Sequence, residues 1–304
     1  MIINVGGRTD IVNYYSEWLL NRLEEGYAFS RNPLFPNKIT KYQLNPDVVD
    51  CIIFCSKNYK PILPHIGEIA ERFNIYCHYT ITAYGKDIEP NVPDIDESIN
   101  TLIELSHIVG KEKIAWRYDP VLLTADYTIE RHIKTFEHMV GKLSSHVGLC
   151  IFSFVEMYKR LEVNMPELIP ITDDNKEVIA KVLGSIAKKC NLKIQTCESN
   201  GDYQQFGIFK SGCMTTAILE QAGGGKFKKV SHNGMREGCH CMPSRDIGAY
   251  NTCLNGCRYC YANKKPELAA ENFKLHDKKS PLLLGQIKPT DIIQNGSQRS
   301  FLVK

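Results

Sequence analysis

Short apolar runs alternate with amphipathic stretches over the first two thirds of the 304-residue chain. Apolar runs of about four to eight residues are typical of buried strands, whereas apolar positions at helical spacing are typical of helices. The pattern predicts strands over residues 2–5, 27–29, 50–55, 75–84, 113–117, 147–154 and 193–196. It predicts helices over residues 14–25, 64–73, 96–109, 129–143 and 175–190, with two shorter ones over 214–221 and 266–273.

Strands that alternate with helices imply a parallel sheet covered by helices. This pattern predicts an α/β fold with a full or partial (β/α) barrel similar to a TIM barrel, and an open sheet is the alternative. The run Gly223-Gly224-Gly225 lacks the flanking strand and helix of a phosphate loop, so we interpret it as a linker. We therefore expect a barrel domain over residues 1–222 and a cysteine-rich iron–sulfur segment over residues 223–304 that packs on the barrel mouth.

Polar residues follow the predicted strands, and the carboxyl ends of barrel strands form the face where active sites lie. Because they carry both charge signs, these residues predict a pocket for a zwitterionic or multiply polar ligand. They are Arg8, Asp10, Arg31, Asn32, Lys57, Asn58, Thr82, Tyr84, Arg117, Asp119, Glu156, Cys197 and Glu198. We interpret Lys57, Arg117 and Asp119 as the candidate catalytic residues. A structural ion pair between Arg117 and Asp119 is the alternative.

Three cysteines lie close together near the C-terminus, in the run Cys253-Leu254-Asn255-Gly256-Cys257-Arg258-Tyr259-Cys260. This spacing puts three thiolates on one short loop, where they can hold three corners of a cuboidal 4Fe–4S cluster. The fourth iron is then open, and an open metal position can bind and activate a substrate. A zinc loop completed by a fourth cysteine is the alternative.

The triad of Cys253, Cys257 and Cys260, with Tyr259 before its last member, resembles the signature of the radical S-adenosylmethionine (radical SAM) enzymes. The resemblance implies that the open iron binds the methionine moiety of S-adenosylmethionine. One electron from the cluster then cleaves the sulfonium and yields a deoxyadenosyl radical. It also implies that Tyr259 packs near the adenine, and that a reductant such as a flavodoxin or ferredoxin supplies the electron.

The position of the triad departs from that signature, because radical SAM enzymes usually carry it after the first strand and follow it with a glycine-rich segment. Here the triad is late, and no such segment follows it. If the barrel is permuted in order, Arg8, Asp10 or Lys57 takes over the binding of the methionine moiety. With Tyr259 and Glu198, Arg8 and Asp10 form the candidate cofactor-binding set. Otherwise the cluster does not bind S-adenosylmethionine at all.

Further runs of sequence extend the resemblance over most of the chain. They are Gly7-Arg8-Thr9-Asp10-Ile11, Ser30-Arg31-Asn32-Pro33, Ser56-Lys57-Asn58, Arg117-Tyr118-Asp119-Pro120, Cys239-His240-Cys241, residues 244–252, and Tyr261-Ala262-Asn263. Together they are similar to an uncharacterised bacterial domain-of-unknown-function family that has a radical-SAM-type cysteine cluster near its C-terminus. This resemblance implies a class of cofactor and no particular reaction.

The chain has 12 cysteines, and in a cytosolic chain of this size they suggest metal or redox chemistry. We interpret five of them as packing residues, because a buried free cysteine behaves as a small hydrophobe. These are Cys51, Cys55, Cys77, Cys150 and Cys190. Four others precede the triad in irregular segments and are candidate ligands of a second, fully ligated cluster: Cys197, Cys213, Cys239 and Cys241. Reduced thiols packed near the first cluster are the alternative.

The composition is that of an ordinary globular protein, with 43% hydrophobic and 23% charged residues. No apolar run approaches the roughly 18 residues that span a bilayer, and the N-terminus reads as a strand rather than a signal peptide, so we expect a cytoplasmic protein without a membrane partner. From Lys226 onward, 14 basic residues stand against 6 acidic ones. This excess suits an anionic partner, and a solvated surface is the alternative.

Three functions are consistent with these observations. The first is a radical SAM enzyme that acts on a small-molecule or nucleic-acid-derived substrate held by the polar pocket. The second is an iron–sulfur electron-transfer or sensing protein with one or two clusters and no radical step. The third is a nucleic-acid-binding module with a zinc-stabilised basic tail, which the absence of an aromatic-rich basic face disfavours.

Overall fold

A parallel sheet of eight strands forms the centre of the fold. The structure is a computed structural model, and it describes residues 1–197, 201–223, 225–228 and 239–303. The strands lie in the order β10 (Ser244–Asp246), β1 (Ile2–Asn4), β4 (Cys51–Ser56), β5 (Ile75–Thr80), β6 (Ile114–Val121), β7 (Leu149–Phe154), β8 (Ile194–Thr196) and β9 (Phe209–Lys210). Strands β4 to β9 follow one another along the chain, and β10 returns to pair with β1.

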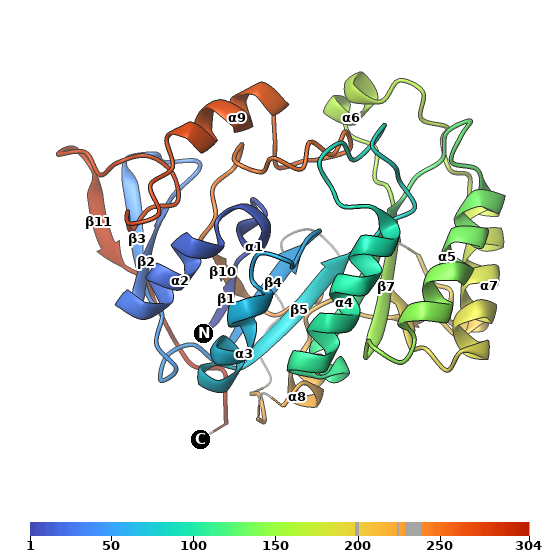
Figure 1. Ribbon diagram of the computed structural model, residues 1–304, viewed down its shortest axis with the longest axis horizontal. Coiled ribbons are helices and arrows are strands. Elements are labelled where there is room, and N and C mark those ends of the chain that lie inside the picture. Colours follow the sequence, from blue (N-terminus) through green and yellow to red (C-terminus); the bar gives the residue numbers. More distant parts are fainter. Residues whose placement is uncertain (198–200, 224, 229–238, 304) are drawn as a thin grey trace.

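Helices cover one face of this sheet, as Figure 1 shows for α3, α4, α5 and α7. The helices of this layer are α1 (Ile11–Tyr14), α2 (Ser16–Glu25), α3 (Leu63–Arg72), α4 (Ile95–Val109), α5 (Ile129–Leu143) and α7 (Asp173–Lys189). Three shorter helices lie outside this layer: α6 (Lys159–Asn164) and α9 (Pro266–Lys274) at the top of Figure 1, and α8 (Thr216–Gln221) at the bottom. Across the described ranges, no helix is both long and apolar enough to cross a membrane.

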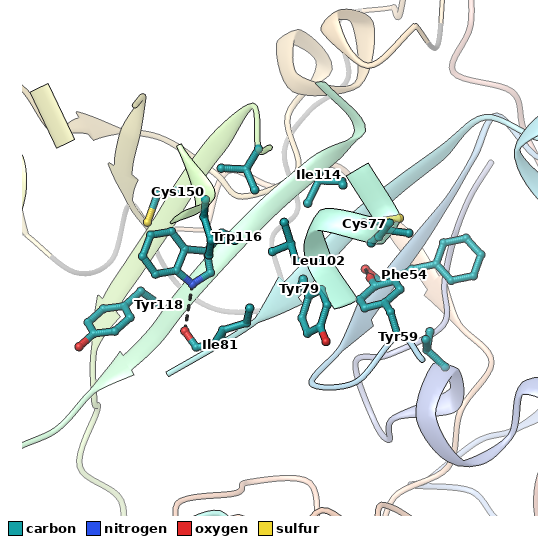
Figure 2. Packing of buried hydrophobic residues seen from close by; sticks show 14 of the residues in the cluster. Phe54, Tyr59, Cys77, Tyr79, Ile81, Leu102, Ile114, Trp116, Tyr118 and Cys150 are labelled. Atoms are coloured by element: carbon teal, nitrogen blue, oxygen red, sulfur yellow. Dashed lines mark hydrogen bonds between the residues drawn. The ribbon is translucent and has the colours of Figure 1, made fainter. Parts of the chain in front are cut away.

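Large aromatic side chains fill the layer between the sheet and these helices, as Figure 2 shows. Trp116 on β6 stacks on Phe136 of α5, with ring centroids 5.2 Å apart. Its indole N–H donates to the backbone oxygen of Ile81 over 3.0 Å, which satisfies the one polar group of a fully buried ring. Because side chains alternate along a strand, the neighbours of Trp116 point to the opposite face.

That opposite face, here called the inner face, has a smaller apolar cluster at the amino ends of the strands. Ile53, Tyr76 and Ile151 of the sheet pack there against Met214 and Met242 from the later part of the chain. Toward the carboxyl ends, the alternating positions of the same strands become polar. The inner face is therefore apolar at the amino ends of the strands and polar at their carboxyl ends.

A second sheet of three strands stands beside the first, in the order β11 (Ile292–Asn295), β3 (Lys38–Gln43) and β2 (Tyr27–Arg31). The sequence pattern predicts β2 but not β3, in which Ile39 is the one buried residue, or β11, whose four residues are all exposed. The prediction that residues 27–29 form a strand of the barrel is wrong, because β2 pairs with β3 in this second sheet. Arg31 therefore belongs to the second sheet, where it pairs with Asp291 over 2.8 Å.

The structure confirms an α/β fold built on parallel strands with helices packed against them. A closed barrel is not shown, because β10 and β9 end the sheet and no pairing joins them among the described residues. Residues 223–304 supply β10 to the main sheet and β11 to the second one. Their last residues are also held, since Ser300 and Phe301 donate hydrogen bonds to Asp50.

Candidate functional site

Residues 253–260, here called the triad loop, lie at the carboxyl ends of β1, β4 and β5. Asn255 at the centre of the loop donates to the carboxylate of Asp10, which follows β1, over 3.0 Å. It accepts a hydrogen bond from the hydroxyl of Tyr14 over 3.0 Å. The φ angle of Gly256 is +70°, a backbone conformation that glycine adopts without strain, so the chain can turn back between the first two cysteines.

Helix α6 holds the other side of the triad loop. The hydroxyl of Tyr158 donates to the backbone oxygen of Tyr259 over 2.8 Å, and Arg160 donates to the backbone oxygen of Asn263 over 3.0 Å. Arg258 in turn donates to the backbone oxygen of Asn164 over 2.8 Å. The sequence pattern did not predict α6, because Leu161 is its single buried residue and no apolar period marks it.

The three thiols of the triad loop are close enough to interact electrostatically. Burial raises the pKa of Cys257, and the charges of Glu89, Cys253 and Cys260 raise it further while Lys57 lowers it. Burial likewise raises the pKa of Cys253, with Asp10 and Cys260 adding to the effect. These raised pKa values mean that Cys253 and Cys257 are uncharged thiols unless a cation stabilises their thiolate forms.

The donor set fits an iron–sulfur cluster by its chemistry, since clusters take thiolate ligands. The backbone N–H of Ala262 points at the sulfur of Cys260 over 3.3 Å, which is the kind of hydrogen bond that tunes a cluster thiolate. Among the residues described, no three His, Cys, Asp or Glu side chains converge to hold one metal ion. In a cuboidal cluster each thiolate binds a different iron, so its ligands stand farther apart than those of one ion.

Glu89 joins three side chains beside the triad loop. Its carboxylate accepts hydrogen bonds from Lys57 over 2.8 Å and from Thr82 over 2.7 Å, and it also accepts one from the hydroxyl of Tyr259. The Lys57 ammonium lies 5.6 Å from the centre of the Tyr259 ring. Burial alone would lower the pKa of Lys57, but the charges of Glu89 and Cys257 outweigh it and raise the pKa. Lys57 therefore stays charged.

Sequence reasoning missed Glu89, which is only 3% exposed. It ends no strand and lies in the loop between β5 and α4, seven residues after Thr82. Its one signal is an acidic residue in a loop rich in proline and glycine, and that signal does not distinguish it from a solvated carboxylate.

Asp10 is buried and its two oxygens are fully engaged. One accepts from the backbone N–H of Asn13 and from the hydroxyl of Ser56, and the other accepts from the backbone N–H of Lys57 and from Asn255. Burial raises the pKa of Asp10 and the hydrogen bonds lower it, with burial the larger effect. Asp10 thus links β1, β4 and the triad loop, and its role is to position the triad loop.

Arg8, predicted with Asp10 to bind the cofactor, lies on the opposite side of β1. Its Nε atom is 4.0 Å from the carboxylate of Asp246 on β10, and its guanidinium lies 5.6 Å from the ring centre of Tyr250. The side chain is 21% exposed, so part of it remains open to a ligand. Glu198, the fourth predicted cofactor-binding residue, lies outside the described residues.

Arg117 and Asp119 form an ion pair on the inner face, on alternate positions of β6. Asp119 also accepts a hydrogen bond from Ser153. Burial raises the pKa of Asp119, but the Arg117 charge, the hydrogen bonds from Ser153 and Arg117, and the Lys57 charge together outweigh burial and lower the pKa. The candidate catalytic residues therefore form one electrostatic group, since Lys57 belongs to the network of Glu89 and also stabilises Asp119.

His78 and two cysteines lie below this pair. The Nδ1 atom of His78 is 3.4 Å from Arg117 and 3.8 Å from the sulfur of Cys55, and Nε2 is 3.1 Å from the backbone oxygen of Cys213. Burial and, to a smaller extent, the Arg117 charge lower the pKa of His78 to about 3, so the imidazole is neutral at pH 7. The sequence pattern predicted Cys55 to be a packing residue, and it contacts His78 here.

The four cysteines predicted to hold a second cluster are not equally placed. The sulfurs of Cys213 and Cys241 are 3.3 Å apart, and the Cys239 side chain interacts with Cys241. A hydrogen bond from Cys241 lowers the pKa of Cys213, and Arg117 acts in the same direction. Cys197 is buried directly after β8.

Comparison with protein families places most of the chain within one family model. A family model described as "Domain of unknown function (DUF1848)" matches residues 2–262, which include the whole triad loop and the inner-face residues. The matched region ends before α9 and β11. No curated protein matches the chain significantly.

Loss of the Asp119 carboxylate tests the electrostatics of the inner face. Asp119→Asn leaves the mostly buried charge of Arg117 without its partner, and we expect the free energy of unfolding at pH 7 to fall by about 3 kcal/mol in urea denaturation. Because the pKa of Asp119 is lower in the folded protein, the ion pair contributes fully to stability above about pH 4, the pKa of an aspartate in the unfolded chain. This stabilisation is lost as the pH falls through the pKa of Asp119 in the folded protein.

Asp173→Asn is the matched control, because Asp173 pairs with Lys176 at the surface and its side chain is 95% exposed. We expect this variant to unfold like the wild type. An equal loss of stability in both variants, or no loss in Asp119→Asn, would contradict the assignment of a structurally important buried pair.

Proposed function

The chain belongs to the DUF1848 family, and we propose that it is a radical SAM enzyme whose triad loop holds a 4Fe–4S cluster with one open iron. The observation that carries this proposal is the placement of Cys253, Cys257 and Cys260 on one anchored loop at the carboxyl edge of a parallel sheet, beside a buried cation–anion pair. The cluster would supply the electron that cleaves S-adenosylmethionine. In this proposal the main sheet is a partial (β/α) barrel, with the triad loop over its mouth.

The residues beside the triad loop suit a zwitterionic ligand. The methionine moiety has an ammonium and a carboxylate, and Lys57 and Glu89 offer the opposite charges 2.8 Å apart. Both lie close enough to Cys257 to shift its pKa, so a ligand on the open iron would meet them. Asp10 already accepts four hydrogen bonds, and it acts by positioning the triad loop.

The inner face below the triad loop suits a polar substrate. Arg117 and Asp119 offer both charges there, and His78 is neutral and close to Arg117. A small-molecule or nucleic-acid-derived substrate would be held by these groups, with its reacting hydrogen turned toward the triad loop. The protein's part is to orient the two ligands and to exclude water, and a flavodoxin or ferredoxin would supply the electron.

A second candidate function is an iron–sulfur electron-transfer or sensing protein without a radical step. One observation favours it: Lys57, Glu89 and Tyr259 satisfy one another, so the groups next to the triad already have partners. Binding of S-adenosylmethionine would have to replace some of these contacts.

Cleavage of S-adenosylmethionine separates the two functions. The protein is purified without oxygen, reconstituted with iron and sulfide, and mixed with S-adenosylmethionine and a strong reductant. We expect deoxyadenosine and methionine from the wild type, and background levels from Cys257→Ala. Cys190→Ala, at the exposed end of α7, is the matched control and should behave like the wild type. A wild type that keeps its four-iron cluster without any cleavage would instead support electron transfer or sensing.

Glu89→Gln tests the ligand-binding side of the triad loop. The variant keeps the three cysteines, so the visible absorbance of the cluster should be unchanged. Because a charge-assisted hydrogen bond contributes about 1.5–3 kcal/mol, we expect at least a tenfold rise in the concentration of S-adenosylmethionine needed for half-maximal cleavage. Glu97→Gln, whose carboxylate pairs with Lys60 at the surface, should leave that concentration unchanged. An unchanged value in Glu89→Gln would remove Glu89 from the binding site.

A further inference from the structure

Two segments from different parts of the chain meet side by side on the inner face, and each contributes a cysteine. The backbone N–H of Met242 donates to the backbone oxygen of Met214 over 2.8 Å, directly beside Cys241 and Cys213. The approach depends on Gly212, since a Cβ atom there would lie 2.8 Å from the carbonyl carbon of His240. The two sulfurs are 3.3 Å apart.

This geometry is that of two thiols ready to form a disulfide. The backbone hydrogen bond between Met242 and Met214 holds the two residues that follow Cys241 and Cys213 together, and the sulfurs are already in contact. The sulfurs need only approach from contact to bonding distance, which side-chain rotation can supply. Ligands that bind different irons of one cluster stand farther apart than two sulfurs in contact.

We propose that Cys213 and Cys241 form a dithiol–disulfide couple, a second redox centre separate from the triad loop. Its reaction partner is an external disulfide, carried by a protein or a small molecule. One thiolate of the couple attacks that disulfide, forms a mixed disulfide and releases one external thiol. The other then displaces the second external thiol, so two thiols and one disulfide become one disulfide and two thiols. Two electrons and two protons pass to the external pair.

The exposure of the cysteines provides a route for this exchange. Cys213 and Cys239 are partly exposed, whereas Cys241 is buried. In the proposed exchange Cys213, the more exposed member of the couple, meets the external disulfide, and Cys241 completes the bond from within. Cys239 interacts with Cys241, so it is the competing partner that the experiment must separate.

The couple adjoins the residues of the polar pocket. The backbone oxygen of Cys213 contacts His78, which in turn contacts Arg117, and the Arg117 side chain also interacts with the Cys213 thiol. A bond between the two sulfurs takes the Cys213 thiol away from Arg117. It also joins the segment that leaves β9 to the segment that enters β10, the two strands that end the main sheet. Oxidation would thus change the contacts of Arg117 on the inner face.

Thiol trapping tests this couple on the full chain, purified without oxygen. The protein is equilibrated in buffers of reduced and oxidised dithiothreitol, alkylated under acid quench, and digested for peptide mass analysis. We expect a cross-linked peptide pair containing Cys213 and Cys241, formed reversibly by two electrons. Cys190→Ser should keep the pair, Cys241→Ser should lose it, and Cys239→Ser should keep it.

Three results would overturn the proposal. The first is that both thiols are still alkylated at the highest ratio of oxidised to reduced dithiothreitol. The second is a cross-link between Cys239 and Cys241 instead. The third is a metal ion or cluster that remains in Cys257→Ala and is lost in Cys241→Ser, because it would make these thiols metal ligands. The trapping readout does not involve S-adenosylmethionine, so it can fail or succeed independently of the radical SAM proposal.

Discussion

The buried carboxylate of Asp10 is the interaction on which the rest of the candidate site depends. A buried anion without partners costs several kcal/mol, and here four donors offset that cost. Two of these donors, Ser56 and Lys57, lie at the carboxyl end of β4, and one comes from Asn255, which is 245 residues away along the sequence. The carboxylate thereby fixes the triad loop against the carboxyl ends of β1 and β4. Without it, the triad loop would lose its anchor to β1 and β4, although its contacts with α6 would remain.

From that fixed loop the polar groups extend inward in two layers. The upper layer is the network of Lys57, Glu89 and Tyr259, and the lower layer is the pair of Arg117 and Asp119. Lys57 couples the two, because its charge acts on Glu89 and on Asp119. A ligand that bound between the layers would contact charged groups of both signs, and the surrounding protein atoms fix the positions of these groups.

Sequence pattern predicted the elements with a strong apolar signal and missed those without one. The helix predicted over residues 129–143 matches α5, and the apolar strands β4, β5 and β7 lie where expected, because burial against the sheet demands a periodic pattern. Strands β3 and β11 were not predicted, because only one of their residues is buried. Within the candidate site, the expectation of polar residues at strand ends singled out Lys57, Arg117 and Asp119, although Arg117 and Asp119 lie within β6 rather than after it. Glu89 comes from a loop whose path only tertiary contacts define. The separation of β2 into another sheet also had no sequence signal, since pairing partners are set by long-range contacts.

The central claim is that the triad loop holds a cluster with one open iron next to Lys57 and Glu89. Electron paramagnetic resonance of the anaerobically reconstituted and reduced protein, with and without S-adenosylmethionine, tests it most directly. The account predicts about four irons per chain and a cluster spectrum that shifts when S-adenosylmethionine is added, with both features lost in Cys257→Ala. A single zinc ion per chain, or a cluster spectrum that S-adenosylmethionine leaves unchanged, would contradict it.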